Sequence, residues 1–176
     1  MGTEFQTLNG QKKSIGDEEI NGLETAMRGR LLTKDHPDYD NARRIWNGMI
    51  DKRPALIAEC SGTADIIAAV RFAAKHGLLT SVRGGGHNIA GSAVCEDGLM
   101  IDLSGLRAVR VDSEARRAFV QPGALLGDVD HETQAFGLAV PTGINSTTGI
   151  AGLALGGGYG WLSRKYGHTV DNIVSV

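Results

Sequence analysis

The chain has 176 residues and a formal net charge of −2 at pH 7, and 41% of its residues are hydrophobic and 22% charged. These values are typical of a globular domain and exclude a generally disordered chain. The near-neutral charge gives no electrostatic reason to expect nucleic acid or a membrane surface as a partner. No apolar run approaches the roughly 20 residues that cross a bilayer. The unusual feature is glycine, with 25 residues, about twice the usual share.

The first 50 residues are interpreted as a polar leader followed by N-terminal helices. Residues 1–16 lack the apolar core of a secretory signal, so we expect a disordered leader there. Apolar residues at intervals of three or four predict a helix over residues 17–31. A second short pattern runs over residues 39–50, and its apolar residues, including Trp46 and Met49, are expected to be buried.

A strand, a helix and a second strand follow. Apolar runs over residues 53–60 and 78–82 predict two buried strands. The spacing between them predicts a helix with Gly77 placed to end it, whose inward face is Ile66, Ile67, Val70, Ala73 and Ala74. This order predicts a right-handed βαβ unit with parallel strands.

Short elements with turn residues between them dominate the second half. Strands are predicted over residues 99–103, 108–112 and 117–123, and the last two are expected to form a hairpin. A helix is predicted over residues 124–136. Residues 170–176 are interpreted as a strand that begins and then stops, which suggests a fragment of a longer protein. The fold class expected is α+β, with a small parallel α/β lobe and a second, mostly antiparallel lobe.

Seventeen of the glycines fall from Gly84 onward, and most of these lie in two clusters. The first, RGGGHN over Arg83–Asn88, directly follows a predicted strand. Its backbone N–H groups can form a nest for phosphate oxygens, although a plain flexible turn explains the same composition. His87 beside this nest could be a cationic anion contact, a general base, a nucleophile or an ordinary loop histidine.

The second cluster, over residues 149–160, contains three adjacent glycines. Each costs up to about 1 kcal/mol inside a helix, which favours a turn that faces a ligand over a helix packed through small residues. Neither cluster matches the Rossmann fingerprint, because Ile89 and Trp161 stand where a third glycine is needed, and there is no P-loop.

The remaining chemistry-bearing residues give no site of their own. The histidines and the two cysteines, Cys60 and Cys95, lack metal-ligand spacing, so no metal site is predicted. No Ser, His and Asp arrangement indicates a hydrolase. The absence of a CxxC pair suits structural thiols in a reduced, cytoplasmic protein.

A family resemblance is carried by four segments in order: RPALIAECSGTADIIAAVRFAAKHG, TSVRGGGHNIAG, GLMIDLSGL and PTGINSTTGIAGLALGGGYGWLSRKYGHTVDNI. Together they resemble the PCMH-type FAD-binding domain of the vanillyl-alcohol oxidase superfamily, closest to its berberine-bridge-enzyme-like, or FAD-linked oxidase, branch. The resemblance covers Pro54–Val176, about 70% of the chain. It implies a C-terminally incomplete FAD-binding domain over 51–176, with lobes of about 51–105 and 106–176 and FAD between them, after the polar leader and N-terminal helices of 1–50.

The resemblance also assigns residues to the cofactor. It implies that the RGGGHN loop wraps the pyrophosphate and that His87 bonds covalently to the 8α carbon of the flavin. Many members form a second bond through a cysteine where this chain has Asn145, so a single bond is expected. Thr148 matches a position thought to influence oxygen access. The full set of implied FAD-binding residues is His87, Arg83, Gly84, Gly85, Gly86, Asn88, Ser92, Pro141, Thr142, Gly143, Thr148, Gly149, Gly152, Gly157, Gly158, Tyr159, Ile173 and Val176.

The activity implied is the oxidation of an alcohol, amine or sugar carbon by hydride transfer to flavin N5, with oxygen as the electron acceptor. The partners are thus a small-molecule substrate and oxygen. Family enzymes carry a substrate domain, with the catalytic base, that this sequence lacks, so the chain alone is expected to turn over poorly. Two alternatives stay open: a non-catalytic module for FAD or another nucleotide, and a piece that self-associates through an exposed sheet edge.

Overall fold

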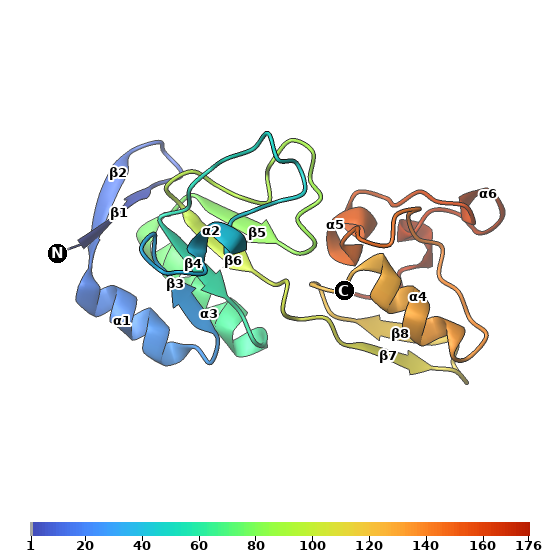
Figure 1. Cartoon of the computed structure of the whole chain (residues 1–176). Helices are drawn as coiled ribbons and strands as arrows, with labels where there is room; N and C mark the ends of the chain where they lie inside the picture. Colours follow the sequence, from blue (N-terminus) through green and yellow to red (C-terminus); the bar gives the residue numbers. More distant parts are fainter. Residues whose placement is uncertain (1) are drawn as a thin grey trace. The chain divides into compact units, whose positions relative to one another are not determined.

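The computed structural model describes residues 2–176. The chain divides into two compact units, the first ending at Gly105 and the second beginning at Leu106. Figure 1 shows their elements, with a sheet and its helices in the first unit and a hairpin with short helices in the second.

A four-stranded sheet with the order β3-β4-β6-β5 forms the centre of the first unit. Strands β4 (Leu56–Glu59), β6 (Leu99–Asp102) and β5 (Thr80–Arg83) run parallel, and β3 (Arg30–Leu32) is antiparallel to β4. The predicted parallel strands on either side of a helix are confirmed. The structure adds that β6 lies between β4 and β5, so the 99–103 strand belongs to the parallel sheet.

The register brings the carboxyl ends of the three parallel strands to one edge of the sheet. Glu59 and Arg83 both pair with Asp102, which lies between them. Beyond the strands, the N–H of Cys60 donates to the Asp102 carbonyl over 2.9 Å, and the N–H of Leu103 donates to the Arg83 carbonyl over 2.8 Å. Each loop that follows a parallel strand therefore starts at the same edge.

Helix α3 (Thr63–His76) ends at Gly77 in the left-handed conformation with φ 64°, as predicted. The predicted inward face is right for buried Ala73 and wrong for Ile67 and Val70, which are about half exposed, and for exposed Ala74. The face that is buried instead carries Asp65, Ala69, Phe72, Ala73 and His76. The buried Asp65 carboxylate accepts hydrogen bonds from the loops beside it, and this polar anchor sets the rotation of the helix.

Residues 2–16 are ordered, so the disordered leader expected there is wrong. Strands β1 (Gly2–Gln6) and β2 (Lys12–Gly16) form an antiparallel hairpin that leads into α1 (Asp17–Ala26). Phe5 and Ile15 are fully buried, and the Phe5 ring packs edge-on against a ring of α3 with centroids 6.5 Å apart. Two apolar anchors thus fix a hairpin whose composition is otherwise polar.

Only the start of the 39–50 pattern is helical, as α2 (Tyr39–Ala42). Ile45 and Ile50 pack against the core of the sheet, whereas Trp46 and Met49 are 62% and 91% exposed, contrary to the prediction. The core they adjoin consists of Leu32, Tyr39, Ala42, Ile57, Val94 and Met100. We call residues 43–52 the strap, because the segment passes from α2 along the loop that follows β5.

The second unit contains the predicted hairpin, β7 (Val109–Asp112) with β8 (Arg117–Val120), followed by α4 (Leu126–Gln134). Buried Leu126 and Val129 turn one face of α4 inward. Within the described residues of this unit the antiparallel sheet is limited to this hairpin.

Short helices make up the rest of the second unit: α5 (Ile150–Leu155), α6 (Ser163–Tyr166) and a 3-10 helix over Val170–Asn172. The preference for a turn over a helix was therefore wrong for 150–155 and right for the glycine run that follows. The predicted strand over 170–176 is also wrong. A strand needs a hydrogen-bonded neighbour, and none of the described residues pairs with that segment.

Candidate functional site

The loop after β5, residues 84–92, begins at the carboxyl edge of the parallel sheet, where ligands bind in open α/β sheets. Gly86 has φ 68°, and a Cβ there would lie 3.4 Å from Arg83 Nε and 3.6 Å from Ile45 Cγ2. These are ordinary contact distances, so it is the backbone conformation that favours glycine at this position. The N–H groups of Gly84 and Gly85 donate to no acceptor in the described part of the chain. They are open donors of the kind that bind phosphate oxygens.

Arg83 turns its side chain back toward the sheet and the strap. Its guanidinium donates to the Ala42 carbonyl and lies 3.5 Å from the Asp102 carboxylate. Arg83 Nε is buried and has no hydrogen-bond partner among the described residues. The side chain therefore fixes the start of the loop and keeps one unsatisfied donor beside it.

Asn88 and Ser92 form the end of the loop. The side-chain oxygen of Asn88 accepts the N–H of Ser92 over 2.9 Å, and its carbonyl accepts the N–H of Gly91 over 3.1 Å. A Cβ at Gly91 would meet the Ile50 side chain at 2.8 Å. Asn88 is thus committed to a local turn, which is packed against the strap.

The strap contributes residues that the sequence interpretation left outside the site. The Trp46 N–H donates to the Gly86 carbonyl over 3.0 Å, and Asn47 Nδ2 donates to the Ile89 carbonyl over 2.9 Å. The Trp46 ring stacks on the His87 ring, with centroids 5.3 Å apart and planes 23° apart. In the sequence, the only sign of this contact was the pair Trp46 and Asn47 in a segment whose helical pattern is weak.

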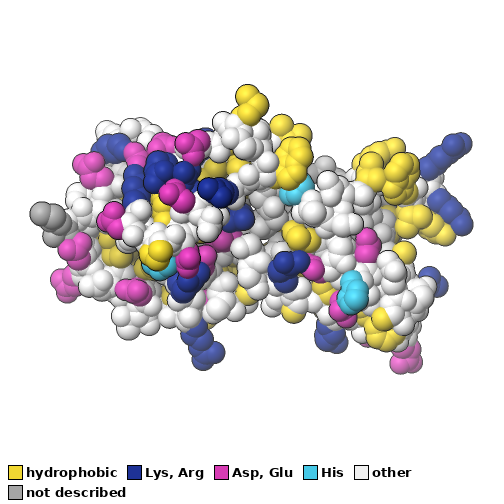
Figure 2. Space-filling view, in the orientation of Figure 1, with side chains coloured by type: hydrophobic (Ala, Val, Ile, Leu, Met, Phe, Trp, Pro, Cys, Tyr) yellow, Lys and Arg dark blue, Asp and Glu magenta, His cyan; other side chains and the backbone are white. Residues whose placement is uncertain are grey.

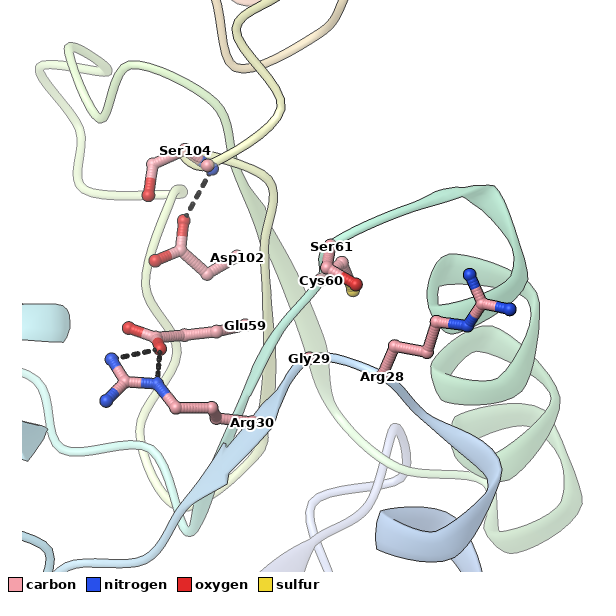
Figure 3. Close-up of a pocket in the computed structure, with 9 residues that line it drawn as sticks. Arg28, Gly29, Arg30, Glu59, Cys60, Ser61, Asp102 and Ser104 are labelled. Carbon is pink, nitrogen blue, oxygen red and sulfur yellow. Dashed lines mark hydrogen bonds and ion pairs between the residues drawn. The ribbon is translucent and has the colours of Figure 1, made fainter.

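A pocket lies at the same edge of the sheet, lined by residues that include Arg30, Glu59, Asp102 and Ser104 (Figure 3). Arg30 pairs with Glu59 at 2.6 Å, and the Ser104 N–H donates to Asp102 over 2.9 Å. Arg28 points away from this pair in Figure 3. The carboxylates that line the pocket are therefore already engaged.

Asp65 supports the back of this pocket. Its carboxylate accepts the N–H groups of Arg28 and Gly29 over 2.9 Å, and both the N–H and the hydroxyl of Ser61 over 2.8 Å. Burial opposes ionisation, but these hydrogen bonds outweigh it and lower the pKa of Asp65 to about 2. Burial, with Asp65 and Asp102 nearby, raises the pKa of the Cys60 thiol to about 12. Asp65 is thus a structural anion, and Cys60 is no nucleophile at neutral pH.

In the second unit, several predicted FAD-binding residues pack closely against their neighbours. A Cβ at Gly160 would overlap the Thr142 carbonyl, and one at Gly143 would overlap the Leu153 side chain. The glycines in this part of the cluster therefore serve close internal packing, together with buried Pro141 and Thr142.

Other glycines of that cluster are open. Nothing lies within 4 Å of a Cβ built at Gly152 or Gly157, so the space beside these two glycines is open. The Gly157 N–H nevertheless donates to the Ala154 carbonyl over 3.1 Å, and the Gly157 carbonyl accepts the N–H of Val170 over 3.0 Å. Gly149 precedes α5, and the Thr148 carbonyl accepts the N–H of Leu126 over 2.9 Å. The backbone carbonyl of Thr148 is therefore already hydrogen-bonded within the second unit.

Asn145 and the terminal residues occupy the surface. The Asn145 side-chain oxygen accepts the N–H of Thr147 over 3.1 Å and its hydroxyl over 2.9 Å, which closes a local turn. Tyr159 is 70% exposed, and Ile173 and Val176 are also exposed. Figure 2 shows hydrophobic side chains gathered over the α5 and α6 region.

The structure places the two sets of predicted residues in different units. The set from Arg83 to Ser92 lies in one loop at the sheet edge, and the set from Pro141 to Tyr159 surrounds α5. Their contact with FAD remains a prediction. No group of three potential metal ligands occurs within residues 2–176. Across the same residues, no helix has the length and apolar character needed to cross a bilayer.

Comparison with known proteins gives a consistent result. The family described as FAD binding domain matches residues 54–176. The chain is 39% identical over 151 residues to (R)-6-hydroxynicotine oxidase of Paenarthrobacter nicotinovorans, covering 86% of this chain and 33% of that protein. It is also 39% identical over 143 residues to berberine bridge enzyme-like 8 of Arabidopsis thaliana, covering 77% of this chain and 27% of that protein.

A solved structure agrees with these relatives. Wild-type Phl p 4.0202, a glucose dehydrogenase, matches with a TM-score of 0.82 at 31% identity, over 90% of this chain and 35% of that one. The chain spans about a third of the length of the relatives it matches. The predicted α+β, PCMH-type fold is thus confirmed. By its sequence and its fold, the chain belongs to the FAD binding domain family of FAD-linked oxidoreductases.

Proposed function

We propose that the chain is the FAD-binding part of an enzyme that oxidises a small organic substrate at an alcohol, amine or sugar carbon, with oxygen as the electron acceptor. When bound, FAD supplies the two-electron acceptor, taking hydride at N5. The names of two relatives support this range of substrates: one is a 6-hydroxynicotine oxidase and the other a glucose dehydrogenase. The observation that carries the proposal is the glycine loop after β5, with open N–H donors at the sheet edge.

The described residues fit the cofactor in both units. In the first, Gly84 and Gly85 offer backbone N–H groups for the pyrophosphate, and the Arg83 side chain fixes the start of their loop against the sheet and the strap. In the second unit, taken by itself, the open space beside Gly152 and Gly157 leaves room for a ligand to approach. The roles of the individual FAD-binding residues inferred from the resemblance, in both units, are part of this proposal.

His87 is the residue we propose to bind the flavin covalently. One nitrogen of its imidazole would replace a hydrogen of the 8α-methyl carbon. The N–H and C–H bonds break, an N–C bond forms, and the two protons and two electrons released reduce dioxygen to hydrogen peroxide. Asn145 has no thiol, so a single covalent bond is expected.

The test is to supply FAD to the purified chain and precipitate it with acid. Flavin absorbance that stays with the protein is expected in the wild-type chain and absent from His87→Ala. Exposed His131 gives a matched control, and His131→Ala should retain the flavin. Acid-stable flavin in the His87→Ala variant would contradict the covalent assignment.

A second candidate is a module that holds FAD without catalysis. The carboxylates Glu59, Asp65 and Asp102 are all engaged in ion pairs or hydrogen bonds, so none is placed as a general base. Anaerobic bleaching of the bound flavin by alcohols, amines or sugars would support catalysis. Binding with no bleaching by any of them favours the module.

We also propose a cytoplasmic location. Cys60 and Cys95 are both free thiols, which are typical of a reducing compartment.

A further inference from the structure

Trp46 lies face to face with His87, outside the segment that matches the FAD binding domain family. Their ring centroids are 5.3 Å apart, and the planes differ by 23°. This is an offset-stacked arrangement, one of the favourable geometries for aromatic rings.

Core packing does not explain the position of this indole. Trp46 is 62% exposed, while its neighbour Ile45 packs against the core of the sheet. The strap therefore turns Ile45 inward and leaves Trp46 at the surface against the imidazole. An exposed tryptophan in contact with a candidate reactive side chain indicates a role at that side chain.

Two hydrogen bonds fix the stack from both sides. The Trp46 N–H donates to the carbonyl of Gly86, immediately before His87, and Asn47 Nδ2 donates to the carbonyl of Ile89, two residues after it. The backbone that carries the indole is thus attached to the backbone that carries the imidazole. Lys52 Nζ adds a third contact, 3.2 Å from the Gly91 carbonyl.

We propose that Trp46 is a positioning residue for His87, which holds the imidazole in one orientation for attachment to the flavin. The inference rests on the proposed covalent role of His87. The indole covers a face of the imidazole, whereas both ring nitrogens lie on the edge of the ring. Stacking therefore restricts rotation of the side chain without covering the edge of the ring that carries the nitrogens.

Trp46 takes no part in the bonds that change. As above, an imidazole N–H and an 8α C–H bond break, an N–C bond forms, and dioxygen takes the two electrons and two protons. The effect of Trp46 is confined to the fraction of time that His87 has a productive orientation. A stacked aromatic pair is worth a factor of about two to ten in such a population.

The experiment uses the full 176-residue chain, produced under riboflavin limitation and then mixed with FAD in air. Acid-stable flavin is followed with time in the wild type, Trp46→Ala, Trp46→Phe and Met49→Ala. Met49 is the matched control, because it lies on the same strap and is 91% exposed. Affinity for FAD before attachment is measured separately without oxygen.

Trp46→Ala should slow attachment about two- to tenfold with unchanged FAD affinity. Trp46→Phe should restore most of the rate, and Met49→Ala should match the wild type. In the chain without FAD, the His87 ring protons should show an upfield NMR shift from the indole, which is lost in Trp46→Ala. That readout tests the stack independently of the cofactor.

Three outcomes would overturn the inference. If Trp46→Ala attaches flavin at the wild-type rate, the stack has no positioning role, while the assignment of His87 stands. If affinity and attachment rate fall by the same factor, Trp46 supports FAD binding and does not orient His87. If the wild type forms no acid-stable flavin, or His87→Ala still does, the proposed covalent role fails first, and the inference fails with it.

Discussion

Asp65 is expected to be the polar group on which the stability of the first unit depends most. Replacement by alanine removes the acceptor for three backbone N–H groups, those of Arg28, Gly29 and Ser61. Each buried donor left without an acceptor costs about 1 to 3 kcal/mol. Because the loops can relax, we expect Asp65→Ala to lower the free energy of unfolding by about 3 to 5 kcal/mol.

The pKa of Asp65 also predicts how the free energy of unfolding changes with pH. The pKa of Asp65 is lowered from 3.8 to about 2 in the folded chain, so the folded state binds its proton less readily than the unfolded state. The stabilisation is therefore complete above pH 3.8 and is lost as the pH falls through about 2. A difference of nearly two pKa units corresponds to about 2 kcal/mol.

Urea unfolding of the wild type, Asp65→Ala and the exposed control Asp35→Asn measures both effects. The difference between the wild type and Asp65→Ala should shrink by about 2 kcal/mol between about pH 6 and about pH 2. Asp35→Asn should stay within about 0.5 kcal/mol of the wild type. A difference that is small at neutral pH, or that does not change with pH, would refute the assignment of Asp65 as a buried anion.

Further predictions concern other parts of the chain. Phe5→Ala should lower the free energy of unfolding by about 3 to 5 kcal/mol, because the side chain is fully buried, and an unchanged urea midpoint would mean that the hairpin does not contribute to the fold. Gly158→Ala should destabilise the second unit, since φ is 69° and a Cβ would overlap Thr169, whereas Gly152→Ala should be neutral or stabilising by up to about 1 kcal/mol; equal urea midpoints for the two variants would contradict this. Cys60 should resist thiol reagents in the native chain at about pH 8, because burial raises its pKa to about 12, and rapid labelling before unfolding would show that the thiol is accessible.

Local sequence signals determined several elements of this protein. Short apolar runs and Gly77 predicted two parallel strands and the end of the helix between them, and turn residues predicted the β7–β8 hairpin. The glycine loop was correctly placed directly after a strand. These features depend on neighbouring residues in the chain, which is why the sequence alone was sufficient.

Tertiary contacts decided the features that were predicted wrongly. The hairpin of β1 and β2 is stabilised by Phe5 against α3, more than sixty residues away in sequence. The rotation of α3 follows from Asp65, whose partners lie on loops from other parts of the chain. Asp65, which accepts hydrogen bonds from three backbone N–H groups, is buried, whereas Ile67 is exposed. The spacing of apolar residues within the helix could not predict this.

The candidate site divides in the same way. The sequence by itself predicted the glycine loop and His87 as site residues, because the run of glycines and the family resemblance are both visible in the residues. It could not identify Trp46 and Asn47, since their role depends on a strap that passes beside a loop some forty residues later. The site is a local motif held by a distant segment, and only folding brings the indole against the imidazole.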